Sequence, residues 1–91
     1  MSGHVFHPGH DEWHGQTVVV YAGTRTVIGR WDSVQGDQVR MMDVAIHGDG
    51  ADEGREEWVA RLAKFGVPVD ERAFALPQGE VEKVVRLRDA T

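Results

Sequence analysis

Runs of β-branched and aromatic residues dominate the first half of the chain and predict three consecutive β-strands. Residues 17–22 read TVVVYA, and residues 25–34 read RTVIGRWDSV after a connection of two residues. β-Branched and aromatic side chains favour strands, and so short a connection favours a hairpin. Residues 38–47, QVRMMDVAIH, predict a third strand after a polar turn.

Two irregularities within these strands predict a sheet that curls. Gly29 lies inside the second strand, where a glycine indicates a bend or a close approach of two backbones. In the third strand the alternation changes phase, which a bulge or a barrel corner produces. The apolar residues then divide between two faces, with Val39 and Met41 on one and Met42, Val44 and Ile46 on the other.

The pattern changes to helical spacing at residues 55–65, REEWVARLAKF, after a polar loop. Trp58, Leu62 and Phe65 recur at the spacing of one helical stripe and are expected to face the core. Gly66 and then Pro68 follow, and glycine followed by proline is a typical helix end. The sequence therefore predicts one helix between the third strand and the remainder of the sheet.

Two further strands are predicted, at residues 72–76 and 82–88, joined by a tight turn that begins at Pro77. The expected fold is a single α+β domain over residues 16–91, a five-stranded curled antiparallel barrel with the helix inserted between strands three and four. Residues 1–15 are expected to form an irregular arm. The expected core residues are Val18, Val20, Val27, Ile28, Val39, Val44, Ile46, Trp58, Leu62, Phe65, Phe74, Leu76, Val85 and Leu87.

Composition narrows the class of protein. The chain has 91 residues, 10 basic against 15 acidic side chains, a net charge of −5 and no cysteine. Without cysteine, disulfides, thiolate metal sites and a cysteine nucleophile are excluded. The net negative charge argues against a broad basic surface that would bind nucleic acid or anionic lipid. No apolar run reaches the roughly 20 residues of a membrane span, so a cytoplasmic protein without membrane contact is expected.

The order of elements resembles that of the Sm-like and SH3-like small barrels. The resemblance covers residues 16–47 and 72–88, with a valine-rich strand, a glycine-centred bend and then an aspartate before an apolar strand. Sm-like RNA sites use an aspartate and an asparagine around the third strand. Here Asp37 matches the position of the aspartate, and Asp43 stands in place of the asparagine. The resemblance therefore implies the fold and carries over no functional residues.

Histidines in the N-terminal arm form one candidate site. Imidazoles with neighbouring carboxylates suit zinc, nickel or copper, and the spacing of four residues between His10 and His14 is common among zinc ligands. Pro8 and Gly9 interrupt any helix there, so an arm whose histidines contact only water is the alternative. The candidate metal ligands are His4, His7, His10 and His14.

Arginines on the predicted strands form a second candidate site, for a nucleic acid or another anion. Cross-strand pairing with acidic side chains is the alternative, which the net negative charge favours, so nucleic acid is not the expected partner. The arginines concerned are Arg30, Arg40, Arg86 and Arg88.

Catalytic equipment is sparse in this sequence. His47 and Asp49 could form an acid–base pair, but no nucleophile or cofactor motif accompanies them. We therefore expect a non-enzymatic binding or assembly domain, without a cofactor, that takes a protein partner or a second copy of itself through a strand edge. An Sm-like nucleic-acid-binding module and a metal-binding histidine arm remain the two alternatives.

Overall fold

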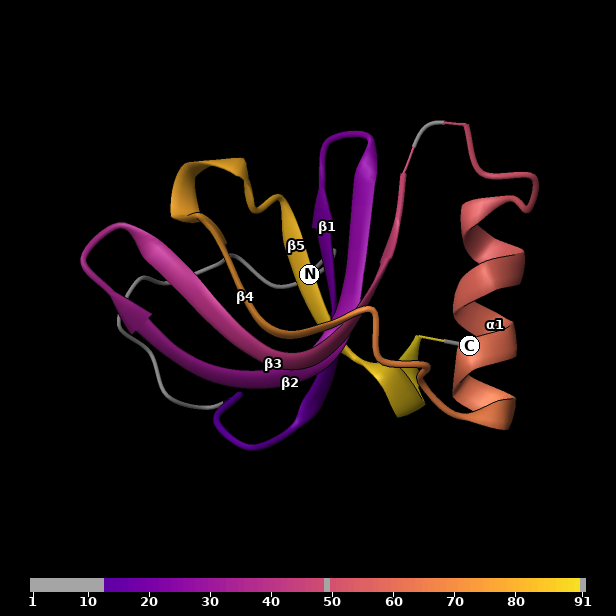
Figure 1. Cartoon of the computed structure of the whole chain (residues 1–91), viewed down its shortest axis with the longest axis horizontal. Helices are drawn as coiled ribbons and strands as arrows, with labels where there is room; N and C mark the ends of the chain where they lie inside the picture. Colours follow the sequence, from indigo (N-terminus) through magenta and orange to yellow (C-terminus); the bar gives the residue numbers. More distant parts are fainter. Residues whose placement is uncertain (1–12, 49, 91) are drawn as a thin grey trace.

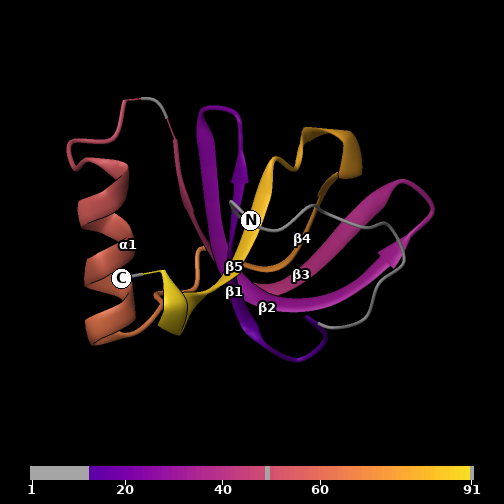
Figure 2. The ribbon, with the colours of Figure 1, turned by 180° about the vertical axis from the view of Figure 1, so that it is seen from behind.

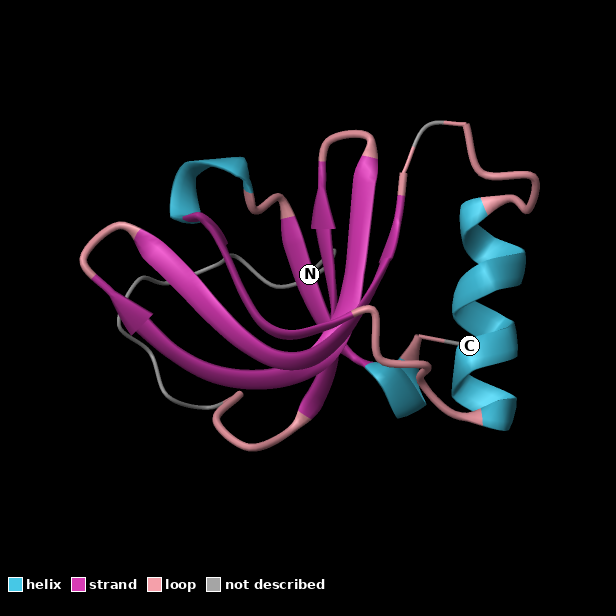
Figure 3. Cartoon of the chain, viewed as in Figure 1, coloured by secondary structure: helices cyan, strands magenta, loops and turns pink. Residues whose placement is uncertain are grey.

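One antiparallel sheet of five strands and one helix make up the fold, in a computed structural model that describes residues 13–48 and 50–90 (Figures 1 and 3). The strands follow the order β4-β3-β2-β1-β5 across the sheet. In chain order the elements are β1 (Thr17–Ala22), β2 (Arg25–Gln35), β3 (Gln38–His47), α1 (Arg55–Phe65), β4 (Glu71–Pro77), the 3₁₀ turn η1 (Gln78–Glu80), β5 (Lys83–Arg86) and the 3₁₀ turn η2 (Leu87–Asp89). The α+β class, the antiparallel sheet and the inserted helix are confirmed.

The last strand is shorter than the sequence predicts. A strand was expected over residues 82–88, whereas β5 ends at Arg86 and the chain then forms η2, closed by the N–H of Ala90 on the carbonyl oxygen of Leu87 (3.1 Å). β5 ends early because its partner β1 ends there: Arg86 already lies opposite Val18, one residue from the start of β1. Leu87 instead packs beside the helix.

The sheet curls but is not closed. In the described part of the chain β4 and β5 are its two edges, and no ladder joins them. The expected closure into a barrel is therefore not seen. Because β5 has four residues before the chain turns toward α1, it offers little strand for β4 to pair with.

A close approach of β2 and β3 produces the curl. A β-carbon on Gly29 would overlap the Val44 side chain and lie 3.0 Å from the carbonyl oxygen of Met42. The register between the two strands shifts around this glycine, and Asp43 opposite it has a φ of 52°. A residue in that left-handed region is typical of a bulge. The close approach expected at Gly29 is confirmed.

The bulge changes which face the residues of β3 occupy. Val39 and Met41 before it, and Val44 and Ile46 after it, all pack into one hydrophobic cluster. The expectation that they lie on two opposite faces is wrong. The bulge adds one residue at Asp43, so Val44 and Ile46 after it face the same side of the sheet as Val39 and Met41 before it.

Two hydrophobic clusters lie on opposite sides of the sheet. The inner cluster fills the curl, and its buried members are Trp13, Val18, Val20, Ala22, Val27, Trp31, Val39, Met41, Val44, Leu76 and Val84. The outer cluster lies beneath α1, which stands outside the curl of β2, β3 and β4 (Figures 1 and 2). Its buried members are Val19, Ile28, Ala45, Trp58, Val59 and Leu62. Sheet residues are thus buried on both faces, which explains the unbroken apolar run in β1.

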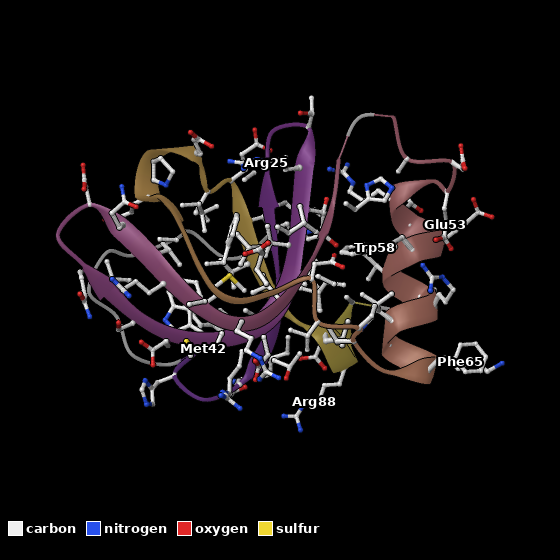
Figure 4. The ribbon with its side chains drawn as sticks, in the orientation of Figure 1. Arg25, Met42, Glu53, Trp58, Phe65 and Arg88 are labelled. Carbon is white, nitrogen blue, oxygen red and sulfur yellow. The ribbon has the colours of Figure 1, made fainter. Side chains whose placement is uncertain are left out.

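Phe65 is the clear error among the expected core residues. Its side chain is 76% exposed and projects away from the sheet at the end of α1 (Figure 4). The chain leaves the helix at Gly66, and Val67 packs against the outer cluster instead. Ile46, Phe74, Val85 and Leu87 are half-buried, and the other expected core residues are buried.

Replacing Thr26 with valine is expected to stabilise the protein by about 1 kcal/mol. Thr26 is fully buried, and its hydroxyl has no hydrogen-bond partner within the part of the chain that the structure describes. Valine keeps the shape and removes a desolvated polar group. Urea unfolding measures the change, and Thr17→Val at an exposed strand position serves as the control. A loss of stability in Thr26→Val would show that the hydroxyl does make a hydrogen bond.

Candidate functional site

The histidine arm contributes one residue to the described structure. His4, His7 and His10 lie outside the described residues. The Nδ1 of His14 donates to the carbonyl oxygen of Asp32 at 2.5 Å, at an exposed position. Among residues 13–48 and 50–90 no three His, Asp or Glu side chains converge as a metal site would require. Zinc or nickel binding by the arm stays a prediction.

Three of the four expected arginines lie around one end of the domain. This end, called the foot below, comprises the start of β1 at Thr17, the last turns of α1, and η2 (Figure 1). Arg30 is the direct neighbour of Thr17 on β2, and Arg86 lies opposite Val18 on β5. Arg88 follows in η2, and Figure 4 shows it at this end.

A hollow of about 500 Å³ opens at the foot, and we call it the foot hollow. Strand β1, helix α1 and the β5–η2 segment form its walls. Its lining, among the residues that the structure describes, combines two guanidinium groups, two neutral polar side chains and two apolar ones. The lining residues are Gln16, Thr17, Ala63, Arg86, Leu87 and Arg88.

Arg86 is held in place at the edge of this hollow. Its Nε donates to the Oε1 of Gln16 at 2.5 Å, and its guanidinium lies 5.3 Å from the ring centre of Trp13. The Asp89 carboxylate lies 3.8 Å away, and that side chain is 59% exposed. Such an exposed ion pair contributes little, so the aromatic ring and the amide do most to orient Arg86.

The other two arginines of the expected patch, Arg30 beside the foot and Arg40 farther along the sheet, do not line the foot hollow. Arg30 is 3.7 Å from the carboxylate of Asp43, and Arg72 reaches the same carboxylate at 4.0 Å. Cross-strand pairing thus accounts for Arg30. Arg40 lies on β3 between Ser33 and Ala75, away from the foot hollow. The structure therefore divides the expected basic patch into separate parts.

The exposed edge of β4 forms a second candidate site. The N–H of Gln78 donates to the carbonyl oxygen of Asp37 at 2.7 Å, which sets the alternation of hydrogen bonds between β4 and β3. In an antiparallel ladder every second residue turns its backbone groups to the other side. Ala73 and Ala75 therefore direct their N–H and C=O groups to the open edge. No sequence pattern revealed this edge, because it depends on the strand order.

Hydrogen bonds and a ring contact that no sequence motif predicted hold the start of α1 in place. The Nε2 of His47 donates to the carbonyl oxygen of Glu53 at 2.6 Å, and the His47 ring lies 5.3 Å from that of Trp58. The hydrogen bonds from Arg61 hold the pKa of the Glu53 carboxyl below its usual value. Asp49, the expected partner of His47, lies outside the described residues. These contacts fix the loop before the helix.

A second hollow, of about 740 Å³, lies beside Tyr21 near the start of α1. Arg55 and Lys83 lie over the Tyr21 ring at 5.2 Å and 5.5 Å. Two acidic side chains, Glu56 and Glu82, line the same hollow. Its charges therefore balance, unlike those of the foot hollow.

Comparison with known proteins adds no further constraint. No family model matches the chain, and none of the curated proteins matches it significantly. Within residues 13–48 and 50–90, no helix has both the length and the apolar character needed to cross a membrane.

Proposed function

We propose that this chain is a non-enzymatic binding and assembly module that adds an extended strand along the open edge of β4. The strand comes from a protein partner or from a second copy of the chain. The observation that carries the proposal is the open edge, where Ala73 and Ala75 offer unpaired backbone groups in the described structure. Such an edge is a template for another strand, whose backbone hydrogen bonds supply the affinity.

The side chains of β4 support this use of its edge. On the inner side Leu76 is 1% exposed and Phe74 packs against the inner cluster, so the strand is anchored. On the outer side Ala73 and Ala75 leave the approach unobstructed. Pro77 lacks an N–H and ends the strand, which limits the number of residues that pair. A short partner strand therefore fits best.

Kinship with the Sm-like and SH3-like small barrels and a cytoplasmic location are parts of the same proposal. The curled five-stranded meander with its glycine at the bend supports the kinship. The acidic, cysteine-free composition supports the location.

Replacing Ala75 with proline is expected to abolish self-association. Proline removes the N–H that Ala75 turns to the open edge, and proline is tolerated at such edge positions. Ala75→Ser keeps the N–H and is the matched control. Light scattering after size exclusion, at low and high protein concentration, measures the mass of each variant.

We expect the mass of the wild type and of Ala75→Ser to rise with concentration, and that of Ala75→Pro to remain that of a monomer. The amide NMR spectrum of Ala75→Pro verifies that the variant is folded. A wild-type chain that stays monomeric at the highest concentration would overturn self-association through β4. Equal association of the proline variant would place the contact elsewhere.

A further inference from the structure

The foot hollow has the size and position of a ligand site. Its volume of about 500 Å³ lies within the range of roughly 300–1,000 Å³ typical of small-molecule pockets. Residues from both ends of the chain meet there, since Thr17 begins β1 and Leu87 begins η2. Ala63 on α1 forms the third side, so a strand, a helix and the β5–η2 segment border this open space.

The charged side chains that line the foot hollow are positive, whereas the net charge of the whole chain is negative. The whole protein carries −5, yet among the described residues two arginines and no acidic side chain line this space. The larger hollow beside Tyr21 lacks this asymmetry, because Glu56 and Glu82 offset its two cations. Low-dielectric walls lined by one sign of charge concentrate ligands of the opposite sign.

The two guanidinium groups differ in how they are held. Arg86 is oriented by Gln16 and by the Trp13 ring, so little side-chain entropy remains for it to lose on binding. Arg88 is exposed and forms no ion pair within the part of the chain that the structure describes. The planar fork of arginine matches carboxylate and phosphate groups. One arginine is therefore positioned, and the other is available to close on a bound anion.

We propose that the foot hollow binds a small organic anion. Arg86 and Arg88 take its carboxylate or phosphate group, and the hydroxyl of Thr17 is in reach as a further hydrogen-bond donor. Ala63 and Leu87 contact the apolar part of the ligand. This site is independent of the β4 edge, so either proposal stands if the other fails.

A single compact anion fits this site better than a nucleic-acid strand does. A nucleic acid needs a track of cations that follows successive phosphates. Beyond the hollow, Arg30 is paired with Asp43, and Arg40 lies on another part of the sheet surface. Two of the four expected arginines therefore line the hollow, one is ion-paired beside it and one lies apart, which does not make a track of cations.

Titration of the full chain with phenyl phosphate, and separately with benzoate, tests the site by amide NMR. Benzyl alcohol has the same ring without a charge and is the control ligand. We expect saturable shifts at Thr17, Ala63, Leu87 and Arg88 with either or both anions and none with benzyl alcohol. Comparing the two anions decides between phosphate and carboxylate.

Arg88→Gln tests the role of the arginine, and Arg40→Gln is the matched control at another exposed position. We expect Arg88→Gln to weaken binding at least about tenfold and Arg40→Gln to leave it unchanged. Arg88 is exposed, so its replacement leaves the fold intact, as the same spectra verify. Equal affinity in Arg88→Gln, shifts confined to the Tyr21 hollow, or equal shifts with benzyl alcohol would each overturn the proposal. Tighter binding of a mixed oligonucleotide that depends on Arg40 would replace it with a nucleic-acid surface.

Discussion

Gly29→Ala is expected to lower the free energy of unfolding by about 3 kcal/mol. The added methyl group would overlap the Val44 side chain and crowd two backbone atoms of β3, namely the Met42 carbonyl oxygen and the Val44 Cα, each at 3.0 Å. Backbone cannot move aside as the end of a flexible side chain can, so the two strands would have to separate at the bulge. Urea unfolding followed by tryptophan fluorescence measures the loss.

Gly79→Ala is the matched control for this change. Gly79 lies in η1, where an added β-carbon has no heavy atom within 4 Å, and it does not occupy the left-handed region. Its replacement should change stability by less than about 0.5 kcal/mol. Equal effects of the two substitutions would show that the close approach at Gly29 does not hold the curl.

Leu62→Ala is expected to cost about 3 kcal/mol and to loosen the helix from the sheet. Leu62 is 1% exposed and lies in the outer cluster. Beneath that helix, Val19 pairs with Ile28, and Ile28 pairs with Ala45, so one apolar row crosses three strands. Removing the leucine leaves a cavity above this row. Thermal unfolding measures the loss, and faster exchange of the helix amides reports the loosening.

Phe65→Ala on the same helix distinguishes the exposed position of Phe65 in the structure from the buried position that the sequence predicts. Phe65 is 76% exposed, so its truncation should cost less than about 0.5 kcal/mol. The helical stripe read from the sequence placed Phe65 beside Leu62 in the core. If Phe65→Ala lowered the free energy of unfolding as much as Leu62→Ala does, Phe65 would have to be buried, which would contradict its exposed position at the end of α1.

The local elements were predictable because each depends on residues close together in the chain. The bounds of β1, β3 and α1 match the expected ranges, β2 is one residue longer at its end, and β4 is one residue longer at each end. β-Branched runs, the glycine at 66 and the change to helical spacing carry this information. The tight connection at Pro77 was also expected, and η1 occupies it.

The features that the sequence did not reveal depend on distant residues. The phase switch in β3 was recognised, but its effect on the apolar faces required the bulge at Asp43 opposite Gly29. The burial of Val19 required a helix on the outer side of the sheet. The open edge of β4 required the strand order, which short-range patterns do not contain.

In the candidate sites too, the sequence indicates the residue types, whereas their grouping depends on residues that are distant in the chain. Residue type pointed to the arginines, but their grouping depends on which strands are neighbours. Arg86 and Arg88 share the foot hollow, whereas Arg40 lies apart. Gln16 and Trp13, which orient Arg86, lie about 70 residues away along the chain, so no motif could connect them.

Amide hydrogen exchange along β4 in the monomeric chain tests the open edge most directly. Phe74 and Leu76 direct their amides toward β3, whereas Ala73 and Ala75 direct theirs to the open side. We expect slow exchange at the first pair and fast exchange at the second, with protection of Ala73 and Ala75 appearing when a second strand binds. Slow exchange at all four amides in the monomer would mean that this edge is already paired within the chain, and would contradict an open sheet and a binding edge together.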